Sequence, residues 1–174
     1  FITSLGVSGP VVMTGGSNGT LIEYDGTTYT NLSSLLPGFS GAITAIGTNG
    51  TTWLIGGNNQ LYAYDGTNMT NLSSAFDAAY GGVPYSIAWN GSVWMITGQD
   101  IASFDGATFT SLSSALPFSG SNMHAAWNGS LWLVVGNNGL IYTYDGSTAT
   151  TIDGPDNSNL YSVASDGKNW LIGG

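Results

Sequence analysis

The chain has 174 residues, of which only 6% are charged and 12% are aromatic, and its formal net charge is −9 at pH 7. A disordered chain combines few aromatic residues with many charges, so this composition favours a folded domain. Because Lys168 is the only Lys or Arg, the chain lacks the cations that bind nucleic-acid phosphates or anionic lipids, and no apolar run reaches the roughly 18 residues that insert across a membrane.

Sequence markers recur along the chain with a constant period. An aromatic-Asp-Gly triplet begins at residues 24, 64, 104 and 144. An apolar run ending in glycine precedes each triplet, and a fifth such run, residues 170–174, closes the sequence. Repeats of about 40 residues are typical of propellers and solenoids, in which each repeat is one structural unit.

Each repeat predicts four short strands, taken here in chain order. The first strand is small and apolar, as in residues 42–46 or 86–89, and an Asn-Gly pair follows it. Asn-Gly between apolar runs signals a hairpin, because both central residues of a type I′ turn need positive φ. The second strand is the run ending in glycine (53–57), the third carries the aromatic residue of the triplet (61–64), and the fourth follows the Asp-Gly turn (28–32). No segment predicts a helix, because β-branched, aromatic and glycine residues dominate throughout.

Four antiparallel strands in each repeat predict an all-β fold, a β-propeller with four-stranded blades. A β-solenoid is the alternative, although its coils are usually shorter and less hairpin-like. The blade repeats cover about 1–35, 41–75, 83–115 and 121–152, and residues 159–174 form a half blade. The single domain 1–174 is therefore five-bladed or a portion of a larger ring.

Both ends of the sequence supply the first two strands of a blade. We therefore expect hairpins at 1–16 and 159–174, with an unpaired outer edge on the last strand. Natural proteins cover such edges, so we expect further residues of a longer chain, or a strand donated by a neighbouring subunit, to cover it. The sequence also begins with Phe1 rather than Met, which favours a processed chain or a piece of a longer one.

The repeat resembles the kelch repeat. In that pattern an apolar strand ends in a double glycine, as in Trp53-Leu54-Ile55-Gly56-Gly57, and a Tyr-containing strand with an Asp-led turn follows, as in Tyr64-Asp65-Gly66. An aromatic residue three positions before Leu completes it, as in Phe109 and Leu112. The resemblance covers essentially the whole chain, with repeats shorter than the roughly 50 residues usual for kelch. It implies a propeller that binds partners, and it implies no single activity.

The sequence offers few groups for catalysis or metal binding. It contains no cysteine, and His124 is the only histidine, whereas transition-metal sites recruit several such ligands. Asp153 and Asp156 form a carboxylate pair of the kind that glycosidases use, but their Gly- and Pro-rich surroundings predict a loop. We therefore expect no catalytic residues, no metal and no cofactor, and a binding or structural domain rather than an enzyme.

Tryptophan occurs at two positions of the repeat. The first carries Trp53, Trp94, Trp132 and Trp170, and predicts core packing between blades. The second is the residue before the Asn-Gly pair, which is Trp89 or Trp127 in two copies but Thr or Ser in others. A position that accepts such different residues is not a fixed core position. Trp89 and Trp127 are therefore candidate ligand-binding residues that could stack on sugar rings, and packing against a neighbouring loop is the alternative.

Seven Asn-X-Ser/Thr sequons are candidate glycosylation sites: Asn18, Asn31, Asn49, Asn68, Asn71, Asn90 and Asn128. Glycans would supply the solubility that charged surfaces normally provide. We therefore expect an extracellular or cell-surface structural or adhesion module. We expect it to be glycosylated, part of a larger protein or assembly, able to self-assemble through the incomplete blade, and bound to a protein or glycan partner. A lectin-type propeller is the alternative function, and a carbohydrate-active enzyme is less favoured.

Overall fold

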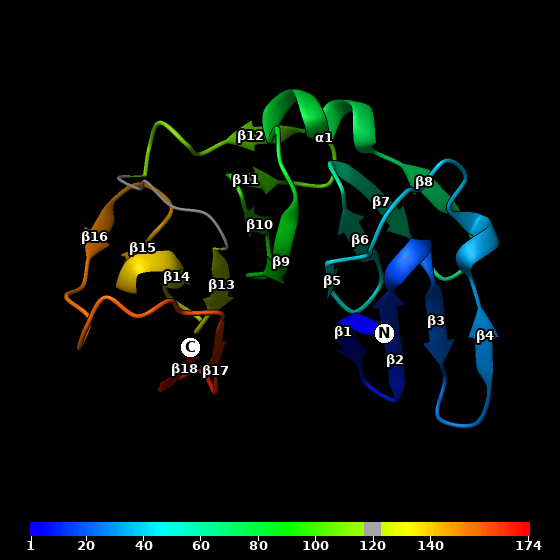
Figure 1. Ribbon diagram of the computed structural model, residues 1–174, viewed down its shortest axis with the longest axis horizontal. Coiled ribbons are helices and arrows are strands. Elements are labelled where there is room, and N and C mark those ends of the chain that lie inside the picture. The colour runs from blue at the N-terminus through cyan, green and yellow to red at the C-terminus, as the bar shows by residue number, and fades with distance from the viewer. Residues whose placement is uncertain (117–122) are drawn as a thin grey trace.

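The computed structural model describes residues 1–116 and 123–174. Four four-stranded antiparallel sheets and one two-stranded sheet stand side by side around an open ring (Figure 1). This arrangement confirms the predicted all-β propeller with four complete blades and a half blade. The predicted start of the fourth repeat, at residues 121–122, lies outside the described residues. The described residues include no helix long and apolar enough to cross a bilayer.

Consecutive strands build each blade from the inside of the ring outward. Blade 1 contains β1 (Ile2–Ser8), β2 (Val11–Gly16), β3 (Leu21–Tyr24) and β4 (Tyr29–Asn31). Blade 2 contains β5 (Ala45–Thr48), β6 (Trp53–Gly57), β7 (Gln60–Tyr64) and β8 (Met69–Asn71). Blade 3 contains β9 (Pro84–Trp89), β10 (Trp94–Gly98), β11 (Ile101–Phe104) and β12 (Phe109–Ser111). Blade 4 contains β13 (His124–Trp127), β14 (Trp132–Val135), β15 (Ile141–Tyr144) and β16 (Ala149–Thr151), and the half blade contains β17 (Ser162–Ser165) and β18 (Trp170–Gly173).

Side-chain acceptors hold the turns inside the blades. In the turn between β3 and β4, Asp25 Oδ1 accepts hydrogen bonds from the Thr27 and Thr28 backbone N–H groups, both at 2.8 Å. The predicted Asn-Gly hairpins form, but as four-residue turns rather than type I′ turns. Only the glycine takes positive φ, 94° at Gly50, because Asn49 Oδ1 accepts from two backbone N–H groups further along the turn.

The first strand of blade 2 begins later than the sequence predicts, at Ala45 instead of residue 42. The preceding residues bond to the neighbouring blade, because the Ile43 N–H donates to the Gly16 carbonyl of β2 at 3.1 Å. Met123 bonds to Gly98 in the same way between blades 3 and 4. At these two junctions the chain therefore forms a backbone hydrogen bond to the preceding blade before it joins its own sheet.

One helix, α1 (Ser73–Ala79), corrects the prediction that no segment is helical. It lies in the connection between blades 2 and 3, at the top of Figure 1. Phe76 and Tyr80 are one helical turn apart, both are buried, and their rings stack with centroids 4.6 Å apart. An i, i+4 aromatic pair stabilises a helical turn, and burial of this pair against blade 3 fixes a segment whose local sequence is only weakly helical.

The core consists of apolar clusters between neighbouring blades. At the junction of blades 2 and 3, Leu54 of β6 packs with Trp94 and Ile96 of β10. Trp94 and Trp132 are almost completely buried, as the repeat position predicts. Trp170 is only partly buried, contrary to expectation, because the half blade has no third and fourth strands to cover it.

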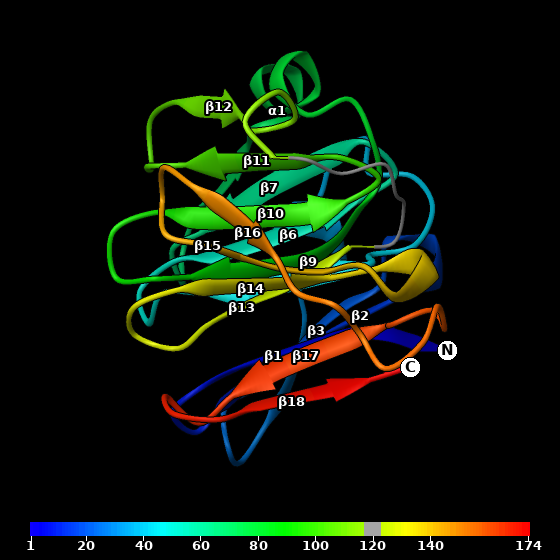
Figure 2. The same cartoon turned by 90° about the vertical axis from the view of Figure 1, so that its left-hand side faces the viewer.

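The ring is open between the half blade and blade 1. The inner strands contact one another in sequence, from β1 to β5, β9, β13 and β17. No comparable contact joins β17 back to β1 within the described ranges. The two terminal hairpins form as predicted and lie along this open side (Figures 1 and 2). Among the described strands, β18 pairs only with β17, so its outer edge carries no strand.

Candidate functional site

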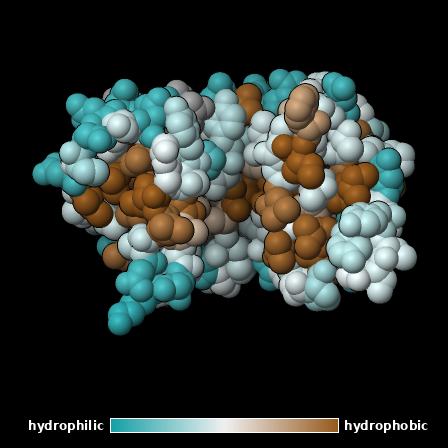
Figure 3. Space-filling view, turned by 60° about the horizontal axis from the view of Figure 1, so that its bottom comes forward, coloured by the Kyte–Doolittle hydropathy of each residue, from teal (hydrophilic) through white to brown (hydrophobic). Residues whose placement is uncertain are grey.

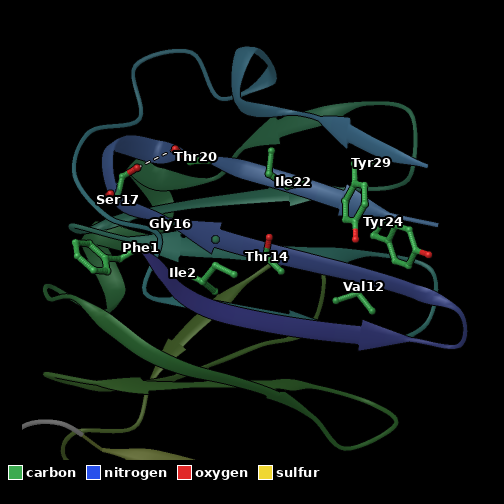
Figure 4. Close-up of a pocket in the computed structure, with 11 residues that line it drawn as sticks. Phe1, Ile2, Val12, Thr14, Gly16, Ser17, Thr20, Ile22, Tyr24 and Tyr29 are labelled. Carbon is green, nitrogen blue, oxygen red and sulfur yellow. Dashed lines mark hydrogen bonds between the residues drawn. The ribbon is translucent and has the colours of Figure 1, made fainter. Parts of the chain in front are cut away.

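A hollow of about 630 Å³ lies on the open side of blade 1 (Figure 4). Its floor consists of Val12 and Thr14 of β2, Ile22 and Tyr24 of β3, and Tyr29 at the start of β4. We call these five residues the leading face of blade 1. Side chains alternate along a strand, so adjacent residues such as Met13 and Leu21 point the other way and pack against blade 2.

The rim of the hollow is built by aromatic rings and by a short polar turn. The Tyr24 and Tyr29 rings stack with centroids 4.5 Å apart, and Tyr29 keeps 77% of its surface exposed. At the other end, the Thr20 hydroxyl donates to the Ser17 carbonyl at 2.9 Å, and Phe1 and Ile2 complete the wall. The hydrogen-bonded turn and the stacked rings thus form the two ends of the hollow.

The side chains that line the hollow are mainly apolar, with a few hydroxyl groups. None of the side chains that line it is ionic at neutral pH, so these side chains offer no carboxylate, imidazole or amine for proton transfer or metal binding. Apolar groups with a few hydroxyls fit the apolar side chains of a protein. The arrangement can therefore bury apolar surface.

The same positions are covered in every other complete blade. In blade 2 the equivalent residues are Trp53, Ile55, Tyr62, Tyr64 and Met69, and all five pack against blade 1. Blades 3 and 4 repeat this packing against blades 2 and 3. The leading face of blade 1 is thus one side of a blade–blade interface that lacks its other side. The sequence did not predict this bare face, because equivalent positions in the repeats look alike whether or not a neighbouring blade covers them.

The two candidate tryptophans lie at equivalent places on neighbouring blades, and the structure does not bring them together. The Trp89 ring packs on Trp94 with centroids 5.0 Å apart, and the Trp127 ring packs on Trp132 at 5.1 Å. Both are partly buried, so each contributes to a blade junction. Trp89 also lines a smaller hollow of about 270 Å³, together with Asn49, Thr52 and Asp105 among others. Trp127 is not among the residues that line it.

The seven sequons differ in the state of the side-chain amide nitrogen. Asn68 Nδ2 donates to Asp65 Oδ2 at 3.2 Å, and Asn71 Nδ2 donates to the Tyr62 hydroxyl at 2.9 Å. In Asn49, Asn90 and Asn128, Oδ1 accepts from the turn backbone. The Nδ2 atoms of those three residues make no hydrogen bond within the described part of the chain, and neither do those of Asn18 and Asn31. Nδ2 is the atom that carries an N-linked glycan. Glycosylation is therefore hindered at Asn68 and Asn71, whose Nδ2 atoms are hydrogen-bonded.

The acidic residues and His124 do not gather into a site. The carboxylates of Asp65, Asp105 and Asp145 sit in separate turns, and hydrogen bonds from turn backbone N–H groups hold the pKa of each below its ordinary value. Burial lowers the pKa of His124, which lies beside the Tyr85 ring at 6.5 Å. Across residues 1–116 and 123–174, no group of three potential metal ligands occurs.

Asp156, one of the two loop carboxylates singled out in the sequence, accepts a hydrogen bond from the Ser158 backbone N–H at 2.7 Å. This bond holds the pKa of Asp156 below its ordinary value. The carboxylate therefore stabilises the connection between blade 4 and the half blade. A general acid needs the opposite, a raised pKa.

Comparison with solved structures shows which proteins share this architecture. The WD40 β-propeller domain of Doa1 superposes with a TM-score of 0.72 at 11% sequence identity, and a chain of the mitotic checkpoint complex with a TM-score of 0.71 at 16%. Each match covers 98% of this chain and 60% of the other chain. No family model and no curated protein matches the sequence. The kelch-like subtype stays a prediction, and what these similarities establish is the β-propeller fold.

Proposed function

We propose that this chain is a non-catalytic interaction module that binds a protein partner through the leading face of blade 1. The observation that carries the proposal is the 630 Å³ apolar hollow on a face that every other complete blade keeps covered. Large exposed apolar surfaces on soluble proteins mark interaction sites. The similar chain from the mitotic checkpoint complex, a propeller within an assembly, supports the same reading.

A photo-activatable cross-linker tests this proposal in cells that make the protein. We expect benzoylphenylalanine in place of Tyr29, at the rim of the hollow, to capture a discrete partner. The same group in place of Thr67, in an exposed turn of blade 2, serves as the matched control and should capture none. The proposal fails if both positions give the same products, or if Tyr29 gives none.

We further propose that the module works at the cell surface or outside the cell. The proposal rests on the 6% charged residues and on five sequons whose Nδ2 atoms form no hydrogen bond with the described residues. Glycans on these residues would keep a charge-poor surface soluble. Intact-mass analysis of native material tests it, and unmodified asparagine at every sequon in a protein found inside the cell would count against it.

Glycan binding is the second candidate function, and the hollow beside Trp89 favours it. An indole ring next to the amide of Asn49, the hydroxyl of Thr52 and the carboxylate of Asp105 combines a stacking surface with polar groups, as sugar recognition needs. Glycan-array binding should be lost in Trp89→Ala and retained in Trp127→Ala, the matched variant on the next blade. Binding that survives Trp89→Ala would remove this site.

A further inference from the structure

The two open ends of the ring are the two halves of one kind of interface. One repeat position of the second strand points toward the following blade. It is buried in all four complete blades, where it is Met13, Leu54, Met95 and Leu133. Its counterpart in the half blade, Leu171, is 76% exposed. Leu171 and its cross-strand partner Ala164 line a hollow of about 450 Å³. We call these two residues the trailing face of the half blade.

The four junctions inside the chain show what a trailing face packs against. Between blades 3 and 4, Met95 and Ile101 of blade 3 meet Trp132, Val134 and Tyr142 of blade 4. A trailing face thus always meets a leading face. Figure 3 turns the open side of the ring forward and shows two apolar areas, one over each end of the opening. Because both ends are bare, whatever fills the opening must present both kinds of face.

The outer edge of β18 adds a third requirement. In each complete blade the third strand pairs antiparallel with this edge, as β7 does with β6. The edge of β18 is uncharged (Trp170, Leu171, Ile172 and Gly173) and has no strand beside it among those described. An open apolar edge is a template for another strand, and strand addition through main-chain hydrogen bonds is a known mode of peptide recognition. The occupant should therefore begin with a strand.

The size of the opening decides between possible occupants. Four and a half blades match 60% of the WD40 domain, so a ring of about seven blades leaves room for between two and three more. A second copy of this chain brings four and a half blades and is too large to continue the ring at the same curvature. We propose that the opening is filled by a polypeptide partner built from two and a half blades of this same repeat.

In this arrangement the first strand of the partner pairs with β18, and its last blade covers Val12 and Thr14. The inference rests on the proposed function, because it names the class of partner for the leading face of blade 1. It adds that Leu171 and the edge of β18 belong to the same binding event. Both hollows and the open edge then have one occupant.

The chain itself contains a sequence of the required design. Residues 58–152 run through β7 and β8 and then through all of blades 3 and 4, which amounts to two and a half blades. The chain ends in Trp-Leu-Ile-Gly-Gly, the same five residues that precede Asn58. A second copy of residues 58–152 can therefore follow Gly174 without a linker, and the same segment as a separate polypeptide is the probe for binding in trans.

The first test compares the full chain with this extended chain. We expect the extended chain to be monomeric by light scattering and to unfold at least about 5 °C above the chain alone. Hydrogen exchange of the β18 amides should slow by at least about tenfold. Titration of the chain with the separate 58–152 polypeptide should give a one-to-one complex.

Single substitutions on the two faces supply the controls. Leu171→Asp should change the melting temperature of the unextended chain by no more than about 1 °C, because the side chain is exposed there. In the extended chain, the same substitution should remove the expected rise in melting temperature. Val12→Asp should also remove the gain, whereas Thr67→Asp in an exposed turn should not. The inference is overturned if the extended chain gains no stability, if the gain survives both face variants, or if the chain alone dimerises through Leu171. A protein of another fold cross-linked at Tyr29 would overturn this inference and leave the proposed function standing.

Discussion

A pair of leucines at one repeat position gives the sharpest test of the open ring. Leu54 and Leu171 both follow Trp and precede Ile-Gly-Gly, but Leu54 is 0% exposed and Leu171 is 76% exposed. Leu54→Ala removes three carbon atoms from the junction of blades 2 and 3, which is about 2–3 kcal/mol of transfer free energy. The cavity left beside Trp94 raises the expected loss to about 3–5 kcal/mol. Leu171→Ala removes the same atoms from solvent-exposed surface and should cost less than about 0.5 kcal/mol.

Urea unfolding followed by far-UV circular dichroism measures both values, with the slope of each transition as a check that the variants unfold alike. The expected difference of about 3 kcal/mol depends only on the neighbours of the two residues, since the substitution and the local sequence are the same. A loss above about 1.5 kcal/mol for Leu171→Ala would mean that the trailing face is covered. A loss below about 1 kcal/mol for Leu54→Ala would mean that the blade junctions do not hold the fold together.

Three further predictions follow from the core, the turns and the sequons. Trp132→Ala should cost on the order of 3–5 kcal/mol in the same assay, and a loss below about 1 kcal/mol would show that this Trp is not part of the core. Hydrogen bonds from backbone N–H groups of its turn lower the pKa of Asp166 to about 2. The carboxylate therefore adds to the free energy of unfolding above the unfolded pKa near 4, and this contribution is lost as the pH falls toward 2. Asp166→Asn introduces the asparagine that blades 2–4 carry at this turn position. It should reduce the fall in the free energy of unfolding between about pH 4 and 2, and an unchanged pH dependence would contradict the role given to the Asp166 carboxylate. In native glycosylated material, peptide mapping should find Asn90 more occupied than Asn71, whose Nδ2 is hydrogen-bonded, and the reverse order would show that folded geometry does not control modification.

Local chemistry repeated at a fixed spacing is what made the fold predictable. The Asp-Gly and Asn-Gly pairs mark turns because glycine accepts positive φ and the preceding side chain accepts turn N–H groups, and both effects act within four residues. Successive side chains of a strand point to opposite sides. Trp53 and Ile55 therefore face one neighbouring blade, and Leu54 faces the other. These signals gave the strand number, the hairpins and the blade count without tertiary information.

Other features depended on contacts that the sequence does not encode locally. The helix α1 forms because Phe76 and Tyr80 find a buried position beside blade 3, and the start of β5 is delayed because Ile43 bonds to the preceding blade. The position shared by Trp89 and Trp127 looked free from its varied residues, yet both rings pack against the junction tryptophans. Partners distant in sequence decided the outcome for α1 and β5, whereas for the two tryptophans the residue directly opposite in the same hairpin did.

The candidate site shows most clearly which features follow from the sequence and which depend on the tertiary structure. The sequence by itself determined which side chains of each blade are apolar and which way they point, because these follow from strand alternation. It could not determine which faces remain bare, since Trp53–Gly57 and Trp170–Gly174 are the same five residues. Burial is a property of the neighbours that a side chain meets, and only the tertiary structure shows that Leu54 meets blade 3 while Leu171 meets solvent.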